Sequence, residues 1–288
     1  MKDDILIPIV VSYENQFESN VNAQFYRDTL IQNKWEYEFI GNGEKWNGFI
    51  TKIIAYQSFL RTLPAEKIVV LSDARDVMCC RSPCSFMNSI LPILRENKII
   101  ASAELFLLGR INWTPDQMQE KGADFFYNGT QLTEYWAHFT TPPNASRKYV
   151  NSGLLLGKAT HLLELFNWIV DNQFTDDQLG VAHYMNQFPH KVMLDYEAIY
   201  LHSSTSGTTG GFIDPLLQRL DSPSISELFG MSSYFLHIPG LNGSKGQQRV
   251  YELATSVVKL IATYNTPTMH AMYNLRESDS YNPTYRIV

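Results

Sequence analysis

Asp73 and Asp76 follow a run of apolar, β-branched residues in the segment KIVVLSDARDVM, residues 67–78. The run predicts a buried strand, and ligands of open parallel sheets bind beyond the carboxyl ends of the strands. Two neighbouring carboxylates repel each other, so their pairing favours a cation between them. A hard divalent ion that also contacts substrate phosphates is the usual occupant. Alternatively, Asp73 caps the next turn and Asp76 is solvated.

A second segment that could do chemistry, HIPGLNGSKG, closes another predicted strand at residues 237–246. His237 at the strand end could supply a third metal ligand. Lys245, beyond a glycine-containing turn, could bind a phosphate as a point charge. A structural histidine beside a glycine loop explains the same residues without a ligand.

Polar side chains also gather in TDDQLG and YVNSGLLLG. Asp176 and Asp177 open a predicted helix, where paired carboxylates are good acceptors for sugar hydroxyls. A plain helix N-cap, worth about 1 kcal/mol, accounts for the same pair. Asn151, before Ser152 and a glycine, either bonds a substrate hydroxyl or caps the local backbone.

The elements that must position these side chains alternate between strand and helix, which predicts βαβ units and a mostly parallel sheet. Strands are expected at 5–12, 35–40, 67–73, 98–104, 148–159, 191–195 and 234–240. Helices are expected at 19–33, 51–63, 84–97 (with Pro92 as a bend), 161–172, 176–188 and 247–265. Residues 109–148 read as an irregular lid-like insertion. One α/β domain over residues 1–265, followed by an extended tail at 266–288, is the economical interpretation.

Composition excludes several classes of protein. The net charge is −6 and no cluster of Lys and Arg occurs, which argues against nucleic-acid binding. No apolar run is long enough to span a membrane. The amino terminus lacks the pattern of a secretory signal, so we expect a cytoplasmic protein (host cytoplasm if viral), or a lumenal one only if an upstream signal was removed. Cys79, Cys80 and Cys84 fit neither a disulfide framework nor a zinc site.

The succession of segments GNGEKWNG, VVLSDARDVM, IIASAE, YVNSGLLLG, TDDQLG, VMLDYEAIYLHSS and FLHIPGLNGSKG resembles the glycosyltransferase domain of the procollagen lysyl hydroxylase family. The resemblance covers roughly residues 5–246. More distantly, the chain is similar to other glycosyltransferases with a DxD-type motif. The resemblance implies a GT-A type α/β fold that is Rossmann-like, with a mostly parallel central sheet flanked by helices. A stand-alone domain of this kind without a signal suits a giant DNA virus or a microbe.

Carried over position by position, the resemblance implies three groups of site residues. Asp73, Asp76 and His237 would bind Mn²⁺. The residues that would contact the UDP-sugar nucleotide are Val10 and Ser12 at the uridine, Trp46 beside it, and Lys52 and Lys245 near the phosphates. Those that would hold the sugar are Asn151, Asp176 and Asp177.

Two positions depart from the family pattern. Arg75 replaces an aromatic residue between the two aspartates, and its guanidinium could stack on the uracil or pair with a phosphate. Leu108 replaces a tryptophan that contacts the sugar region, a loss for which Trp113 or Trp136 could compensate.

The resulting hypothesis is a Mn²⁺-dependent transferase that moves glucose from UDP-glucose to galactosylhydroxylysine of a collagen-like protein. The resemblance implies retention of the anomeric configuration. The alternatives are galactosyl transfer from UDP-galactose to hydroxylysine, glucosyl transfer to another protein or glycan, a catalytically silent module that binds UDP-sugar or collagen, and hydrolysis of nucleotide sugars. A homodimer through the final helix and the aromatic tail is possible, although packing of these segments back onto the domain is the preferred reading.

Overall fold

The computed structural model describes residues 7–96, 98–104, 126–127, 130–131, 149–203 and 233–237. Most of the lid-like insertion, the final helix and the tail lie outside these residues. So do Leu108, Trp113, Trp136 and Lys245, whose predicted roles therefore stay predictions.

Within the described residues, nine strands form one sheet in the order β2-β1-β3-β8-β5-β10-β11-β4, with β9 paired to β5. The strands are β1 (Ile9–Tyr13), β2 (Glu36–Ile40), β3 (Ile68–Asp73), β4 (Val77–Cys79), β5 (Ile99–Glu104), β8 (Tyr149–Lys158), β9 (Val192–Asp195), β10 (Leu201–Ser203) and β11 (Phe235–His237). A separate two-stranded sheet joins β6 (Phe126–Tyr127) and β7 (Thr130–Gln131).

The large sheet is mostly parallel. Strand β1 is parallel to β2 and β3, and β10 is parallel to β5 and β11. Only β8, which runs antiparallel to β3 and β5, and β4, which runs antiparallel to β11, reverse the direction. The carboxyl ends of β1, β3, β5, β10 and β11 therefore share one edge of the sheet with the amino-terminal end of β8.

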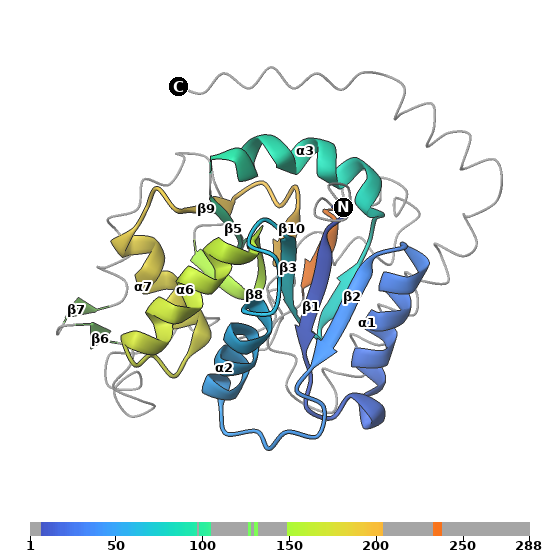
Figure 1. The fold of residues 1–288 in the computed structure, drawn as a ribbon, viewed down its shortest axis with the longest axis horizontal. Coiled ribbons are helices and arrows are strands. Elements are labelled where there is room, and N and C mark those ends of the chain that lie inside the picture. The colour runs from blue at the N-terminus through green and yellow to red at the C-terminus, as the bar shows by residue number, and fades with distance from the viewer. Residues whose placement is uncertain are drawn as a thin grey trace, which may run out of the picture.

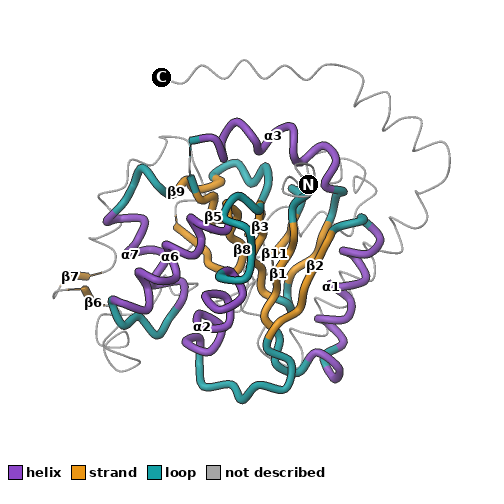
Figure 2. The backbone as a smooth tube through the Cα atoms, in the orientation of Figure 1, coloured by secondary structure: helices purple, strands orange, loops and turns teal. Residues whose placement is uncertain are grey.

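Helices cover both faces of the sheet (Figures 1 and 2). One face carries α1 (Val21–Gln32) and α3 (Pro83–Arg95), and the other carries α2 (Phe49–Leu60), α6 (Ala159–Asp171) and α7 (Asp177–Gln187). A single 3₁₀ turn, η1 (Phe17–Ser19), precedes α1.

Local sequence explains where the first helix begins and which side it buries. The Asn20 side chain accepts hydrogen bonds from the backbone N–H groups of Asn22 and Ala23, which caps α1. Tyr26 and Leu30, four residues apart, lie on one side of the helix and are fully buried. The helix thus starts at its cap and turns an apolar stripe toward the sheet.

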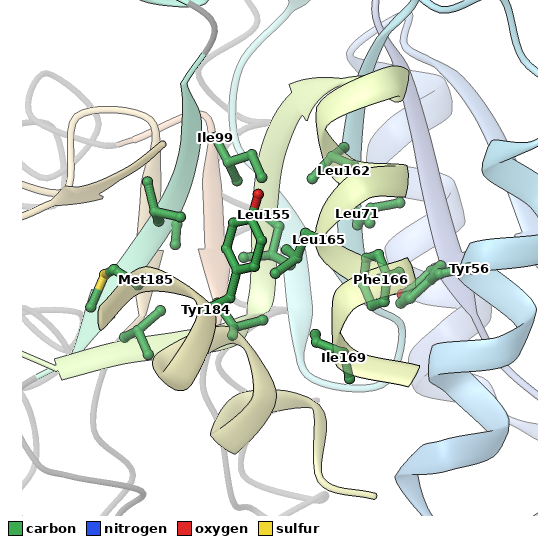
Figure 3. Close-up of a cluster of buried hydrophobic side chains, with 14 of the residues drawn as sticks. Tyr56, Leu71, Ile99, Leu155, Leu162, Leu165, Phe166, Ile169, Tyr184 and Met185 are labelled. Carbon is green, nitrogen blue, oxygen red and sulfur yellow. The ribbon is translucent and has the colours of Figure 1, made fainter. Parts of the chain in front are cut away.

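The apolar core is split between the two faces of the sheet because successive strand residues point to opposite sides. In β1, Val11 joins the cluster under α2, α6 and α7, while Val10 joins the cluster under α1 and α3. Figure 3 shows part of the first cluster, in which Tyr56 of α2 and Phe166 of α6 lie side by side with ring centroids 5.6 Å apart.

The predicted architecture is confirmed: the fold is α/β and Rossmann-like, with a mostly parallel central sheet flanked by helices. Its assignment to the GT-A type stays a prediction. The elements expected within the described residues are present, and α3 continues through Pro92. Four strands of the described residues were not predicted: β6 and β7, inside the segment read as irregular, and β4 and β10 of the large sheet, each of which has three residues. A run of three residues is too short to show a hydrophobic period. β4 and β10 are therefore recognised only by their pairing, β4 with β11 and β10 with β5.

Among the residues that the structure describes, no helix has the length and apolar character needed to cross a bilayer.

The buried position of Phe166 predicts a large loss of stability on truncation. Phe166→Ala should lower the free energy of unfolding by about 3–5 kcal/mol, because it leaves a cavity between α6 and α2. Urea denaturation followed by circular dichroism measures this change. Ile31→Ala, at an exposed position of α1, serves as the control and should change stability by less than about 0.5 kcal/mol. Equal effects of the two substitutions would contradict the described packing.

Candidate metal and nucleotide-sugar site

Three predicted ligands from different parts of the chain meet at the carboxyl edge of the sheet. Asp73 is the last residue of β3, and His237 is the last residue of β11. Asp76 precedes Val77, which pairs with His237 in the antiparallel β11–β4 ladder. This register places both carboxylates beside the imidazole.

The three side chains could share one ion. The imidazole Nε2 of His237 lies 3.5 Å from Asp73 Oδ2 and 3.4 Å from Asp76 Oδ1. One ligand atom from each residue falls within 4.8 Å of the other two. Adjacent ligands of an octahedral ion with metal–oxygen distances of about 2.1 Å are roughly 3 Å apart, so small side-chain movements suffice to close the shell.

A second observation points to a ligand at the same place. His237 is 2 % exposed, and its Nε2 has no hydrogen-bond partner within the described chain. Buried polar atoms are nearly always satisfied, so such an atom requires an explanation. Here the unpaired nitrogen faces two carboxylate oxygens, which is the environment of a cation.

The imidazole is sensitive to its charged neighbours. Burial lowers the pKa of His237, but the carboxylates of Asp76 and Asp73 outweigh burial and raise that pKa above its ordinary value. A proton and a metal ion therefore compete for the same nitrogen.

Gly153 of β8 makes room for this cluster. A Cβ atom at Gly153 would lie 2.1 Å from Cε1 of His237 and 2.8 Å from Asp73 Oδ2. The pairing of β5 with β8 shifts register between Ala101 and Ser102. Such irregularities re-aim side chains beside active sites, and this one brings the Asn151–Gly153 backbone against the cluster.

Lys52 links the cluster to the start of α7. Its ammonium, on the inner side of α2, forms ion pairs with Asp73 Oδ1 and, at 2.7 Å, with Asp177 Oδ2. Burial lowers the pKa of Lys52, but Asp177 and Asp73 more than offset burial, so that its pKa lies well above the ordinary value. Lys52 is thus a permanent positive charge at neutral pH.

The two adjacent aspartates have different roles. Asp176 is the N-cap of α7, and its Oδ1 accepts a hydrogen bond from the backbone N–H of Leu179. Asp177 is buried, and its Oδ2 accepts a 2.8 Å hydrogen bond from Ser152 as well as the Lys52 contact. Asp176 therefore caps α7, and Asp177 contacts Lys52 and β8.

Asn151 caps the local backbone. Its Oδ1 accepts a 2.8 Å hydrogen bond from the N–H of Gly153, and its Nδ2 donates to Glu104 Oε2 at 3.1 Å. Gln178 donates to the other oxygen of Glu104 at 2.7 Å. The result is a buried polar patch at the end of β5, next to Asp177.

Arg75, the departure between the two aspartates, forms a two-pronged ion pair with Glu14. Nε and Nη2 of Arg75 donate to the two carboxylate oxygens of Glu14 at 2.7 and 2.8 Å. Glu14 is buried just beyond β1, while the Arg75 side chain remains 42 % exposed. A buried carboxylate therefore holds a partly exposed guanidinium in the segment between Asp73 and Asp76.

The remaining predicted nucleotide contacts are Val10, Ser12 and Trp46. Val10 is fully buried in the core, and the Ser12 hydroxyl is buried 2.6 Å from that of Ser72. Trp46 is 42 % exposed and lies against Tyr13, with ring centroids 5.8 Å apart. Tyr13 pairs with Asp73 in the ladder, so Trp46 also lies at the carboxyl edge.

Sequence reasoning assigned no role to Glu14, Glu104, Gly153 or Ser203. Glu104 and Glu14 each follow an apolar strand, as Asp73 does, so position after a strand could have identified both. Gly153 and Ser203 depend on strand register, for which a single sequence carries no signal.

No family model matches this chain. It is 24% identical over 252 residues to an uncharacterized protein of Acanthamoeba polyphaga mimivirus, covering 80% of this chain and 49% of that relative, so it spans about half of the relative's length.

Two solved structures are also similar. One is a glycosyltransferase involved in the glycosylation of the major capsid of PBCV-1, with a TM-score of 0.44, 9% identity, and coverage of 85% of this chain and 98% of that one. The other is mouse xyloside xylosyltransferase 1 in its apo form, with a TM-score of 0.42, 11% identity, and coverage of 81% and 96%.

Removal of the Lys52 charge should destabilise the protein strongly. Lys52→Met leaves the buried carboxylate of Asp177 without its cation, which costs about 3–5 kcal/mol of unfolding free energy. Because the folded-state pKa of Lys52 is raised, its contribution is complete below the unfolded value of about 10.4 and is lost only above it. The stability gap to wild type should therefore stay constant from about pH 7 to 9 in urea titrations.

Lys191→Met is the matched control, since Lys191 pairs with Glu164 at the surface. It should cost at most about 1 kcal/mol. A Lys52→Met protein as stable as this control would show that the buried ion pairs contribute nothing.

Proposed function

We propose that the protein is a Mn²⁺-dependent glycosyltransferase that uses a UDP-sugar. The observation that carries the proposal is the convergence of Asp73, Asp76 and the unpaired Nε2 of His237 at the carboxyl edge of the sheet. In doubly wound folds this edge is where nucleotide ligands bind.

The charges around the cluster favour a divalent cation. Asp73, Asp76 and Asp177 carry three negative charges, and Lys52 supplies one positive charge. The excess of carboxylates over positive groups favours a bound cation. Two carboxylates and one imidazole also leave coordination positions for the oxygens of a diphosphate.

A bound divalent ion would neutralise the diphosphate of the leaving UDP. The chain's own residues would do the remaining work. Lys52 keeps Asp73 and Asp177 in place, and Arg75, held by Glu14, presents a guanidinium that can pair with a phosphate or stack on the uracil. Trp46 offers an exposed aromatic face to the base.

The sugar would lie over the polar patch beside α7. Asp177 and Ser152 provide a carboxylate and a hydroxyl there, and Asn151 belongs to the same patch through Glu104. Such groups bond sugar hydroxyls through charge-assisted hydrogen bonds. Asp176 stays in the proposal as the cap that sets the start of α7.

The finer assignment rests on the order of sequence segments. The resemblance to the procollagen lysyl hydroxylase glycosyltransferase domain supports UDP-glucose as donor and galactosylhydroxylysine of a collagen-like protein as acceptor. The reaction would move the glucosyl group to the acceptor hydroxyl and release UDP and a proton. A basic collagen-like peptide would also suit the acidic edge of the sheet.

Release of UDP tests the proposal. Wild type should release UDP from UDP-glucose with Mn²⁺ and a galactosylhydroxylysine peptide, and chelation of the metal should abolish the reaction. Asp73→Ala should lower the rate about 100-fold or more, equivalent to roughly 3 kcal/mol, because a ligand to the ion is lost. Asp28→Ala, at an exposed position of α1, should match wild type.

Product analysis by mass spectrometry separates the alternatives. Transfer only from UDP-galactose would reassign the donor, and UDP release undiminished without acceptor would indicate a hydrolase. Metal-dependent nucleotide binding without turnover on any acceptor would indicate a silent binding module. Absence of both binding and turnover would contradict the proposal as a whole.

The space left by Gly153 predicts a second result. Gly153→Ala should weaken Mn²⁺ binding at least about tenfold, because the added methyl group displaces the His237 ring. Electron paramagnetic resonance measures free Mn²⁺ directly. Gly157→Ala lies on the same strand, with its nearest neighbour atom at 3.3 Å, and should bind Mn²⁺ like wild type. If both variants bind equally well, His237 is not a ligand.

A further inference from the structure

The second ring nitrogen of His237 is the end of a chain of buried hydroxyl groups. Nδ1 of His237 lies 3.2 Å from Oγ of Ser203, which lies 2.9 Å from Oγ of Ser102. Ser102 Oγ in turn lies 3.1 Å from the carbonyl oxygen of Asn151. Both serines are fully buried, and these contacts supply hydrogen bonds to hydroxyl groups that water does not reach.

The carbonyl oxygen of Asn151 determines which group is the donor in each of these hydrogen bonds. A carbonyl oxygen only accepts, so the Ser102 hydroxyl donates to Asn151. Ser102 has then used its one proton, and the contact with Ser203 requires Ser203 to donate. Ser203 has in turn used its own proton, so it accepts from His237, whose Nδ1 must carry the hydrogen.

We infer that Ser102 and Ser203 are positioning residues for the metal site, because their hydroxyl chain keeps the proton of His237 on Nδ1 and directs the Nε2 lone pair at Asp73 and Asp76. The inference rests on the proposed function in that Nε2 is taken as a metal ligand. Partners of this kind select the tautomer and orientation of ligating histidines elsewhere.

Strand pairing explains how residues from four separate strands form this series of hydrogen bonds. Ser203 and His237 are register partners in the parallel β10–β11 ladder, at the carboxyl ends of both strands. Ser102 and Asn151 are register partners across β5 and β8, at the point where that ladder shifts. The hydroxyl chain therefore ties the histidine to the same irregularity that places Gly153 against its ring.

Mn²⁺ affinity tests the inference without any turnover. Ser203→Ala should weaken Mn²⁺ binding about 10- to 100-fold in electron paramagnetic resonance titrations, the usual effect of losing an outer-shell partner. Ser203→Thr, which retains the hydroxyl, should bind more tightly than Ser203→Ala. Ser233→Ala is the matched control: Ser233 is a buried serine next to the same strand, β11, and its hydroxyl donates to Phe235 O. It should bind like wild type.

Nitrogen-15 NMR of the imidazole rings gives a readout that needs no metal. In the metal-free wild type, at a pH where the His237 ring is neutral, the hydrogen should reside on Nδ1, and in Ser203→Ala this preference should weaken. A hydrogen on Nε2 in wild type would overturn the inference.

The same two measurements separate this inference from the proposed function. If wild type binds Mn²⁺ and Ser203→Ala binds it equally well, the hydroxyl chain has no positioning role and the proposed function is unaffected. If wild type binds no Mn²⁺, the proposed function fails, and the assignment of His237 as a ligand fails with it.

Discussion

The arrangement of the site depends on the position of His237. Its Nε2 is buried close to Asp73 and Asp76 and has no hydrogen-bond partner within the described residues. Two carboxylates facing the lone pair of a neutral imidazole repel it in a low-dielectric environment, and either a proton or a metal ion relieves that repulsion. The fold allows this close approach because β3, β11 and the β3–β4 link end at the same edge of one sheet. Gly153 leaves the space in which the ring lies.

Two positively charged side chains near His237 form ion pairs with the surrounding carboxylates. Lys52 brings a permanent charge from α2 to Asp73 and Asp177, so the start of α7 is tied to the end of β3. On the other side of the sheet edge, Glu14 holds Arg75. Lys52 and Arg75 each bring a positive charge to this region, which would give a phosphate-bearing ligand attractive contacts beyond the metal itself.

The fold and the centre of the site could be predicted from the sequence for a physical reason. Hydrophobic period distinguishes strands from helices, and a polar residue that follows a buried strand of a parallel sheet is delivered to the ligand-binding edge. This reasoning located Asp73 and His237 together although 164 positions separate them in the chain. The resemblance of the segments supported the same grouping.

Other features depend on register and helix phase, which a single sequence does not contain. Asp176 and Asp177 are adjacent and chemically identical, yet one caps α7 and the other contacts Lys52, because successive helical residues point about 100° apart. Ser203 belongs to a three-residue strand too short to recognise, and its role depends on its partner in β11. The partner of Arg75 is Glu14, from a segment 61 positions away, which no local pattern indicates.

A crystal structure of the protein grown with Mn²⁺ and UDP, with data collected at the manganese absorption edge, would show whether His237 and the two aspartates bind one ion. We expect one anomalous peak bonded to Asp73, Asp76 and Nε2 of His237, with diphosphate oxygens completing the coordination of the ion. UDP bound elsewhere, or an anomalous peak that does not touch His237, would contradict the proposed metal site.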